Sequence, residues 1–215
     1  MARLRKAARI WRNLAARDAA RRVTVAGDDR VFAIDLPVLF MRAAPLEVEL
    51  GAGLGDFVIE RTGAAPERNF IAVELAGSVA RMLAVRIGRL DLPNLKVIRA
   101  DARTLVNLLM PDSSVAAYHI YFPDPWPKVR HAKHRMFTPG FVASLRRTLK
   151  PGGRVYLATD VRDWADAMFA MMAQAGFKRL DEPPPGRRRS AFWRKYAEAG
   201  KEIFSSAFSA PQGQA

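Results

Sequence analysis

Short apolar runs alternate with stretches of helical periodicity along the middle of the chain. Five runs of about five to eight residues have the length of buried strands rather than of membrane-spanning helices. These runs cover residues 46–50, 69–75, 94–101, 115–122 and 154–160. Apolar residues recur with helical spacing in the ranges 78–90, 137–149 and 164–176, which predicts amphipathic helices. Strands that alternate with helices predict an α/β fold, with a mostly parallel central sheet and helices on both faces.

The regions outside this alternation carry weaker signals. Residues 1–22 combine arginines with apolar residues at near-helical spacing and predict an amphipathic helix. Residues 23–45 are compatible with a strand or with a turn of helix, because two prolines interrupt them. The stretch 182–189 predicts a loop, and the tail after Ser205 is expected to be frayed. The expected parts of the chain are a basic N-terminal helical extension and lead-in at 1–45, one α/β domain at 46–209, and a flexible tail at 210–215.

The composition indicates a folded protein with an anionic partner. Half of the 215 residues are hydrophobic, which is enough for a sizeable core, and no apolar run reaches the roughly 18 residues of a membrane span. The chain has no cysteine, which excludes disulfides, thiolate zinc sites and cysteine nucleophiles. Its formal net charge of +14 favours binding to a polyanion, chiefly nucleic acid. The alternative is that all proteins of the source are basic, which would give the same excess of positive charge.

The basic N-terminus does not contain the continuous apolar segment of a secretory signal. An arginine-rich transit peptide is the alternative interpretation of this segment. Together with the missing cysteines, the pattern is compatible with a cytoplasmic protein. We expect neither a membrane nor a metal ion as a partner, and both a monomer and a homodimer remain open.

Every predicted strand delivers a carboxylate near its C-terminal end. In a parallel sheet these ends meet at one edge, and ligands bind in the crevice outside that edge. A strongly basic protein is not expected to line one edge with five acids by chance. The five acids are Glu49, Glu74, Asp101, Asp124 and Asp160.

The turn GAGLG after the first predicted strand has glycines that let the backbone approach a ligand closely. Its G-x-G-x-G spacing differs from the dinucleotide fingerprint, and Glu49 before it repels phosphate but suits an amine. Glu74 stands where an acid binds ribose hydroxyls in nucleotide-binding sheets, and Asp101 can accept from an adenine amino group. A sulfonium, an amine, a ribose and an adenine together indicate S-adenosylmethionine. The alternative is a structural turn with solvated acids.

The stretch YFPDPWPKVRHAKHR at residues 121–135 follows the fourth predicted strand. It places Asp124 beside the methyl group of the expected cofactor, and the flanking prolines stiffen the backbone around this acid. Trp126 offers either a flat face for a ligand or a buried anchor. The cationic side chains beyond it suit phosphates, unless they form an ordinary solvated charge run. These side chains are Lys128, Arg130, His131, Lys133, His134 and Arg135.

Six motifs in this order resemble the bacterial tRNA (guanine-N7-)-methyltransferase family, whose members are Rossmann-like class I S-adenosylmethionine-dependent enzymes. The resemblance runs from about residue 47 to 177, and the motifs read VELGAGLGDFVIE, FIAVE, RAD, YFPDPWPKVRHAKHR, PGG and ATD. The segment around Asp124 is far more specific than the glycine turn. The resemblance implies methyl transfer to N7 of a guanine in tRNA, which in the family is the guanine of the variable loop.

The resemblance also implies roles for single residues. Asp124 is the implied catalytic position. The implied cofactor-binding residues are Glu49, Gly51, Gly53, Glu74, Asp101 and Asp124. The implied substrate-binding residues are Lys128 and Asp160 at the guanine nucleotide, and Arg130, His131, Lys133 and Arg135 on the RNA.

The chemistry of this transfer suits these residue types. Guanine N7 carries a free lone pair, so the reaction needs no strong base. It needs alignment of N7 with the sulfonium methyl group, and carboxylates such as Asp124 and Asp160 that stabilise the cation forming on the purine. We expect the target base to leave its stack in order to reach the methyl group.

One family element is changed in this sequence. Where the family has T-x-[FY]-E, which helps to grip the guanine, this chain has Ser190-Ala191-Phe192-Trp193. Ser190 keeps a hydroxyl group, whereas Trp193 cannot replace a carboxylate and can instead stack on a base. Two alternatives therefore stay open. One is a diverged methyltransferase that acts on another RNA site or on a small molecule, and the other is a catalytically silent RNA-binding relative.

Overall fold

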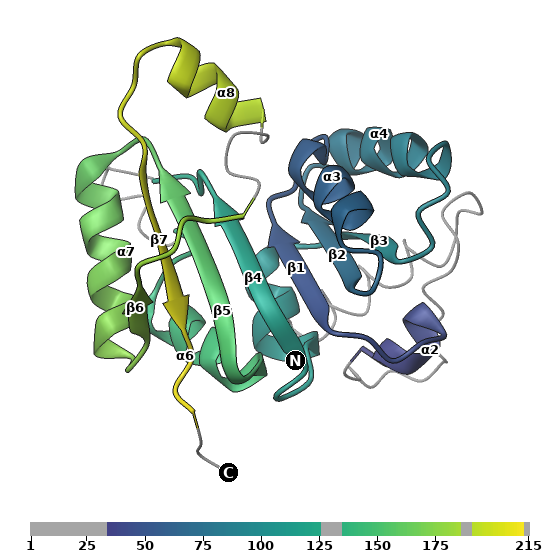
Figure 1. Cartoon of the computed structure of the whole chain (residues 1–215), viewed down its shortest axis with the longest axis horizontal. Helices are drawn as coiled ribbons and strands as arrows, with labels where there is room; N and C mark the ends of the chain where they lie inside the picture. The colour runs from purple at the N-terminus through teal and green to yellow at the C-terminus, as the bar shows by residue number, and fades with distance from the viewer. Residues whose placement is uncertain (1–33, 126–134, 186–190, 213–215) are drawn as a thin grey trace.

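The computed structural model describes residues 34–125, 135–185 and 191–212. Within these residues, seven strands form one sheet in the order β3-β2-β1-β4-β5-β7-β6 (Figure 1). Strands β1 to β5 run parallel, and β7 is antiparallel to its two neighbours, β5 and β6. The strands are β1 (Leu46–Leu50), β2 (Asn69–Glu74), β3 (Leu95–Arg99), β4 (Val115–Tyr121), β5 (Leu149–Thr159), β6 (Lys178–Leu180) and β7 (Phe204–Ser209).

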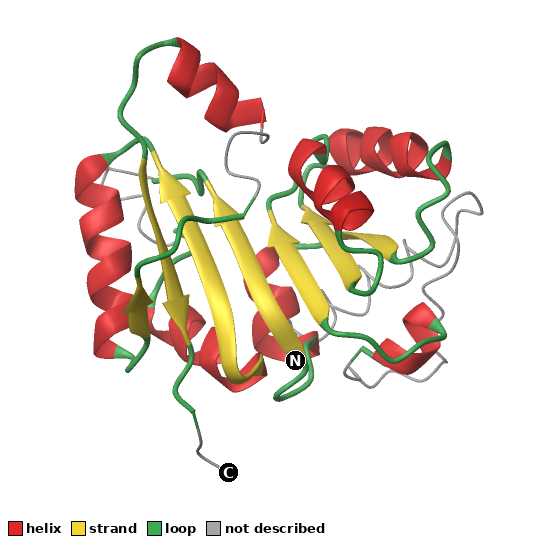
Figure 2. Cartoon of the chain, in the orientation of Figure 1, coloured by secondary structure: helices red, strands yellow, loops and turns green. Residues whose placement is uncertain are grey.

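Helices alternate with the parallel strands, which confirms the expected α/β class (Figure 2). The described helices are α2 (Leu36–Phe40), α3 (Asp56–Ala64), α4 (Gly77–Gly88), α5 (Ala102–Thr104), the π-helix η1 (Leu105–Leu109), α6 (Pro139–Thr148), α7 (Arg162–Gln174) and α8 (Ala191–Glu198). The ambiguous lead-in contains α2, whose first turn holds Pro37. The Asp35 side chain caps this helix by accepting from the Val38 amide at 3.0 Å.

The strand order reverses between β1 and β4, because β2 and β3 lie on one side of β1 while β4 and β5 lie on the other. Connections that leave neighbouring strands in opposite directions open a crevice outside their carboxyl ends. The fold therefore fixes where a ligand site is expected before any side chain is considered.

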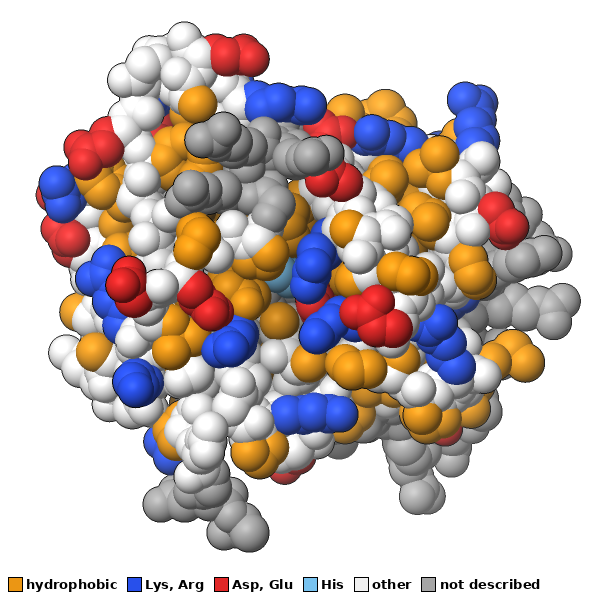
Figure 3. Space-filling model, viewed as in Figure 1, with side chains coloured by type: hydrophobic (Ala, Val, Ile, Leu, Met, Phe, Trp, Pro, Cys, Tyr) orange, Lys and Arg blue, Asp and Glu red, His pale blue; other side chains and the backbone are white. Residues whose placement is uncertain are grey.

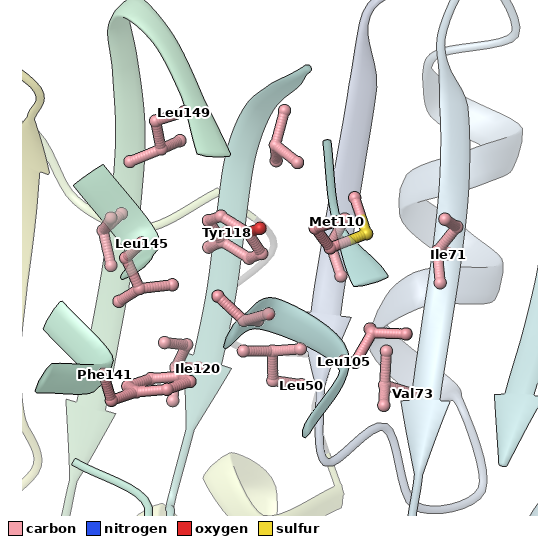
Figure 4. Packing of buried hydrophobic residues seen from close by; sticks show 14 of the residues in the cluster. Leu50, Ile71, Val73, Leu105, Met110, Tyr118, Ile120, Phe141, Leu145 and Leu149 are labelled. Atoms are coloured by element: carbon pink, nitrogen blue, oxygen red, sulfur yellow. The ribbon is translucent and has the colours of Figure 1, made fainter. Parts of the chain in front are cut away.

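Both faces of the sheet are packed. Val48 and Leu50 of β1 belong to a cluster with side chains of η1, α6 and α7 (Figure 4). A second cluster joins the other face of the sheet to α3 and α4. Because side chains alternate along a strand, Glu47 and Glu49 of β1 point toward this second face. Two buried acids thus lie on this face of the sheet.

The C-terminal segment is a strand, so the expectation of a frayed tail after Ser205 is wrong. Strand β7 lies between β5 and β6, and Ala207 and Phe208 are 0% and 1% exposed. Phe208 pairs with Val155 of β5 and packs in the same cluster as Val48. The strand covers the edge that β5 would otherwise expose, and this pairing was not visible in the small and polar residues of FSSAFS.

The helix predicted at 137–149 ends at Thr148, and β5 already begins at Leu149. The PGG motif therefore lies inside β5, where the register with β4 shifts. A Cβ atom at Gly153 would lie 2.8 Å from the Lys150 carbonyl oxygen, so this part of the strand requires glycine at this position.

Candidate functional site

A cavity of about 390 Å³ opens at the carboxyl ends of β1, β2, β3 and β4, where the strand order reverses. Four of the residues predicted to bind the cofactor line it, namely Gly51, Glu74, Asp101 and Asp124. They come from four different strand ends, and the parallel sheet brings them together as its topology requires. Tyr121, Phe122, Met136 and Phe192 contribute an apolar part of the wall.

The glycine turn leaves open space beside the backbone. Gly51, Gly53 and Gly55 have φ angles of 84°, 54° and 79°, which side chains other than glycine rarely adopt. A Cβ atom added at Gly51 or Gly53 would meet nothing within 4 Å. At Gly55 it would lie 2.3 Å from Cδ1 of Leu83, so this glycine serves the packing of α4. The first two glycines can therefore face a ligand, whereas the third has a structural task.

Glu74 and Asp101 are held by backbone amides at the cavity. Glu74 accepts from the amides of Gly53 at 3.0 Å and of Ala76 at 2.7 Å. Asp101 caps α5 by accepting from the amides of Arg103 at 2.9 Å and Thr104 at 3.1 Å. Each carboxylate has further lone pairs, so both acids remain able to accept from hydroxyl or amino groups of a ligand.

The chain leaves β4 through a strained residue. Phe122 has a φ of 52°, and its amide donates to the Ala158 carbonyl oxygen at 2.7 Å. A bulky residue in the left-handed region costs about 1 to 3 kcal/mol and persists where the surroundings enforce it. The turn directs Pro123 and Asp124 to the cavity, where Asp124 is exposed. The strain thus serves the placement of the predicted catalytic carboxylate.

Glu49 lies in β1 just before the glycine turn, but it does not line the cavity. Its side chain is almost fully buried, and Oε2 has no hydrogen-bond partner among the described residues. Burial raises the pKa of Glu49 well above 4.5, although a hydrogen bond from the Val58 amide opposes the rise, and the charges of Asp56 and Glu74 add to it. A buried acceptor without a partner suits a cationic donor.

A polar cluster, formed by the buried Glu47, His119 and Tyr121 and the half-buried Arg61 and Arg68, lies on the face of the sheet that α3 covers. Oε2 of Glu47 lies 2.9 Å from Nε2 of His119, and the Arg61 guanidinium donates to both carboxylate oxygens at 2.8 and 3.0 Å. Arg68 adds an ion pair at 3.1 Å. Nδ1 of His119 lies 3.0 Å from the Tyr121 hydroxyl, so the cluster reaches the cavity wall.

The cluster sets the ionisation of its members. Burial disfavours the Glu47 carboxylate, but hydrogen bonds from His119 and Arg61 outweigh burial and lower the pKa of Glu47 from 4.5 to about 2. Burial also lowers the pKa of His119, against the opposing effect of Glu47. At neutral pH an ionised Glu47 therefore accepts from Nε2–H of a neutral imidazole. Burial raises the pKa of Tyr121, so its hydroxyl donates to Nδ1.

Helix α8 lies beyond the carboxyl ends of β4 and β5 (Figure 1). Trp193 is only 9% exposed, and its ring meets the Tyr121 and Phe122 rings edge to face, with centroids 6.4 and 5.9 Å apart. Phe192 is 51% exposed and borders the cavity. Trp193 thus anchors α8, and its predicted stacking on a base would require the ring to leave this position. Sequence reasoning missed Phe192, although it is the aromatic position of the changed family element.

Known proteins with similar sequences identify the family of the chain. Residues 43–205 match a family described as putative methyltransferases. The chain is 34% identical over 177 residues to a tRNA (guanine-N(7)-)-methyltransferase of Geobacter metallireducens, and the match covers 79% of this chain and 84% of that protein. The chain belongs to the tRNA (guanine-N(7)-)-methyltransferase family. The resemblance inferred from the motifs is therefore confirmed.

A second tRNA (guanine-N(7)-)-methyltransferase, from Psychromonas ingrahamii, is 39% identical over 150 residues, which is 69% of this chain. The match spans 62% of the length of that relative. Among solved structures, a mutant of the 16S rRNA (adenine(1408)-N(1))-methyltransferase of Catenulisporales acidiphilia with its cosubstrate SAM has a TM-score of 0.64. It is 16% identical, with 92% of this chain and 97% of that chain covered, so the likeness shows the Rossmann-like methyltransferase fold alone.

The described residues of this family member fit S-adenosylmethionine. Glu74 and Asp101 offer carboxylate oxygens at the cavity wall. Gly51 borders open space, and the buried Oε2 of Glu49 is an acceptor without a partner in the described part of the chain. These acceptors therefore match the hydroxyl, amino and ammonium groups of S-adenosylmethionine, which donate hydrogen bonds.

Two residues predicted to bind the tRNA are described but are not among the residues that line the cavity. Asp160 accepts from Nζ of Lys201 at 2.6 Å, and the Arg135 guanidinium lies over the Trp164 ring, 5.5 Å from its centroid. Their roles stay predictions. Lys128, Arg130, His131, Lys133 and Ser190, also predicted to bind the substrate, lie outside the described residues, and so does the helix predicted for the N-terminus.

The positive charge of this family member is concentrated in three sequence segments. Residues 1–33, 126–134 and 186–190 carry 15 of the 35 lysines and arginines but only 3 of the 21 acids. On the face shown in Figure 3, the described basic side chains are interspersed with acidic and apolar ones. Two of the three basic segments adjoin the site in sequence, because 126–134 follows Asp124 closely and 186–190 precedes α8.

The described residues contain neither a membrane-spanning helix nor a cluster of metal-binding side chains. None of the helices in the described part of the chain has the length and apolar character that crossing a bilayer requires. Among the same residues, no group of three or more His, Cys, Asp or Glu side chains is arranged to hold a metal ion.

Proposed function

We propose that this protein transfers the methyl group of S-adenosylmethionine to N7 of a guanine in tRNA. The observation that carries the proposal is the cavity at the strand-order reversal, where Gly51, Glu74, Asp101 and Asp124 meet. The names of the family relatives supply the substrate class. Because the match spans under two thirds of the first relative's length, the activity of the whole protein is a proposal here.

Three acids would hold the methyl donor. Glu74, fixed by two backbone amides, would accept from the ribose hydroxyls, and Asp101 at the end of β3 would accept from the adenine amino group. The ammonium group would lie near the glycine turn, where Glu49 provides a buried oxygen. Ammonium binding would favour the ionised form of Glu49, whose burial otherwise keeps it protonated.

Bound S-adenosylmethionine supplies an electrophilic methyl group on a sulfonium. Transfer would form a bond between the N7 lone pair of the guanine and the methyl carbon, break the S–CH₃ bond, and leave the positive charge on the purine. The protein therefore has to align N7 with the methyl group and to stabilise the new cation. Asp124 is suited to both tasks, because the strained turn at Phe122 directs its exposed carboxylate to the cavity.

The RNA would contact the basic segments that adjoin the cavity in sequence. Lys128, Arg130, His131, Lys133 and Arg135 are proposed to bind phosphates, which also orient the tRNA. Asp160 and Ser190 are proposed to meet the guanine nucleotide. Phe192 presents an exposed ring at the cavity, which suits a purine that has left its stack.

A second candidate function is methylation of a different RNA nucleoside. It is favoured by Trp193, which stands where the family has a carboxylate and is buried against Tyr121 and Phe122. Without that carboxylate, the guanine edge loses an acceptor at this position.

The experiment is methyl transfer from labelled S-adenosylmethionine to unmodified bulk tRNA, followed by nucleoside analysis of the product. Label in 7-methylguanosine supports the proposed function, and label in another nucleoside supports the second candidate. Asp124→Ala should lower kcat by about 100-fold or more, because it removes a charge that acts on the developing cation. Full activity of this variant with an unchanged fold would contradict the role of Asp124.

A further inference from the structure

Tyr121 lies at a junction of three parts of the molecule. The residue is part of the cavity lining, and the Phe57 ring of α3 meets its ring edge to face with a centroid distance of 5.0 Å. Trp193 of α8 contacts it on another side. Its hydroxyl group lies 3.0 Å from Nδ1 of His119. A shift of this one ring would therefore change both the cavity wall and the seat of α8.

The imidazole that holds the Tyr121 hydroxyl is itself fixed from several sides. Nε2 of His119 is bonded to Glu47, and the Tyr156 ring stacks on the imidazole with centroids 5.1 Å apart and planes inclined by 13°. Arg61 and Arg68 hold Glu47 in turn. The orientation of His119 is thus set by a hydrogen bond and a stacked ring. The hydrogen bonds that join Glu47, His119 and Tyr121 therefore hold the three side chains in one arrangement.

Ordinary packing does not require this chain of groups. An ion pair to a buried carboxylate contributes little stability beyond well-packed apolar residues of similar volume, so the burial of Glu47 and His119 points to a specific task. Tyr118 lies on the same strand, on the opposite face of the sheet, and shows how a buried tyrosine is ordinarily satisfied. It faces the other cluster and satisfies its hydroxyl with Thr148 alone, at 2.8 Å, next to apolar neighbours (Figure 4).

We propose that Glu47 and His119 are positioning residues, which hold the Tyr121 ring in the place where it shapes the cavity and packs against Trp193. The proposal rests on the proposed function, because the cavity is taken as the site of the methyl donor. His119 acts through the Tyr121 hydroxyl and touches neither substrate. Loss of the hydroxyl should therefore weaken binding of the methyl donor while the fold persists.

The test compares two tyrosine variants on the same strand. Tyr121→Phe and Tyr118→Phe each delete one buried hydroxyl, on opposite faces of β4. We expect both to lower the melting temperature by a similar amount. Only Tyr121→Phe should raise KM and Kd for S-adenosylmethionine, by about fivefold, the loss expected for one hydrogen bond. Calorimetry gives Kd, initial rates give KM and kcat, and thermal unfolding gives the melting temperature.

A double-mutant cycle tests the link to His119. His119→Phe keeps a ring for stacking on Tyr156, and Glu47 keeps Arg61 and Arg68 as partners. If His119 acts through the Tyr121 hydroxyl, the double variant should bind the methyl donor no more weakly than His119→Phe alone. Additive losses of affinity would overturn the proposed link.

The outcomes separate this proposal from the function on which it rests. If the unmodified protein does not bind S-adenosylmethionine, the proposed function fails. If it binds, and Tyr121→Phe changes KM and Kd no more than Tyr118→Phe does, the positioning role is overturned while the function stands. A selective loss of affinity in Tyr121→Phe, shared by His119→Phe, supports the proposal.

Discussion

The backbone amide of Gly53 donates a 3.0 Å hydrogen bond to Oε2 of Glu74, which joins the turn after β1 to the end of β2. The other oxygen of Glu74 accepts from the Ala76 amide at 2.7 Å. One side chain therefore ties two loops together and still faces the cavity. The acid that is proposed to bind the ribose also keeps the glycine turn in place.

This double task predicts the effect of Glu74→Gln. The amide preserves the shape of the side chain but not its charge, so we expect Kd for S-adenosylmethionine to rise about tenfold. Glu67→Gln is the matched control, because the Glu67 side chain is 67% exposed and lies away from the cavity. Calorimetry on both variants measures the change. An unaltered affinity in Glu74→Gln would contradict the assignment of this acid to the cofactor.

The surroundings of Gly55 predict that a substitution there changes the stability of the fold. Alanine at this position would have to adopt a φ of 79° and would meet Leu83 at 2.3 Å. We expect Gly55→Ala to lower the free energy of unfolding by about 2 kcal/mol, through strain and overpacking. Gly63→Ala is the control, because a Cβ atom there meets nothing within 4 Å in α3, and a helix favours alanine by up to about 1 kcal/mol. Chemical denaturation of the two variants should give opposite signs, and equal stabilities would show that the contact with Leu83 is not limiting.

The polar cluster predicts a loss of stability in acid. The pKa of Glu47 is lowered to about 2 in the folded state, so its contribution is present above pH 4.5 and is lost as the pH falls from 4.5 toward 2. The pKa of His119 is also lowered, so the neutral imidazole stabilises the fold above pH 6.5 and this contribution is lost below it. In both cases the unfolded chain binds more protons than the folded one. The free energy of unfolding therefore decreases as the pH decreases.

Urea unfolding at a series of pH values measures this dependence. We expect the Glu47 contribution to be on the order of 2 to 3 kcal/mol between pH 5 and pH 2. His119→Gln should flatten the curve near pH 6, where the unfolded histidine titrates, and it should also reduce the lower part, because the hydrogen bond from His119 helps to lower the pKa of Glu47. A curve of the unmodified protein that is flat from pH 7 to 4 would contradict the depressed pKa of His119.

The concentration of basic residues next to the site predicts a steep salt dependence of tRNA binding. Each phosphate contact contributes about one unit to the slope of log K against log salt, because it releases a condensed counterion. We expect Lys128→Ala to reduce that slope by about one unit. Lys150→Ala is the control, because Lys150 is exposed at the start of β5, at the opposite end of the sheet. Equal slopes for the two variants would argue against phosphate binding at residues 128–135.

The parallel core of the fold was predictable because its signals are local. Each of the runs at 46–50, 69–75, 94–101, 115–122 and 154–160 corresponds to a strand of the sheet, with shifts of a few residues at the ends. The acids at the cavity were predictable for a related reason, since parallel topology alone brings strand ends together. Glu74, Asp101 and Asp124 could therefore be predicted as site residues from their positions at the ends of predicted strands.

The parts that escaped prediction depend on contacts between distant residues. Glu47 and His119 are 72 positions apart, and nothing local shows that two polar residues in separate apolar strands will pair. Strand β7 has small and polar residues, and it is stable only because β5 and β6 lie on either side of it. Trp193 was predicted to stack on a base, and its sequence neighbours do not show that the Tyr121 and Phe122 rings pack against it.

The central claim is that the cavity at the strand-order reversal holds the methyl donor. A crystal structure with S-adenosylhomocysteine, the product left after methyl transfer, tests it most directly. We predict that the adenosine lies between Glu74 and Asp101, that the amino group is within hydrogen-bonding distance of Glu49, and that the sulfur faces Asp124. A ligand bound elsewhere on the sheet, or no ligand at saturating concentration, would contradict the account.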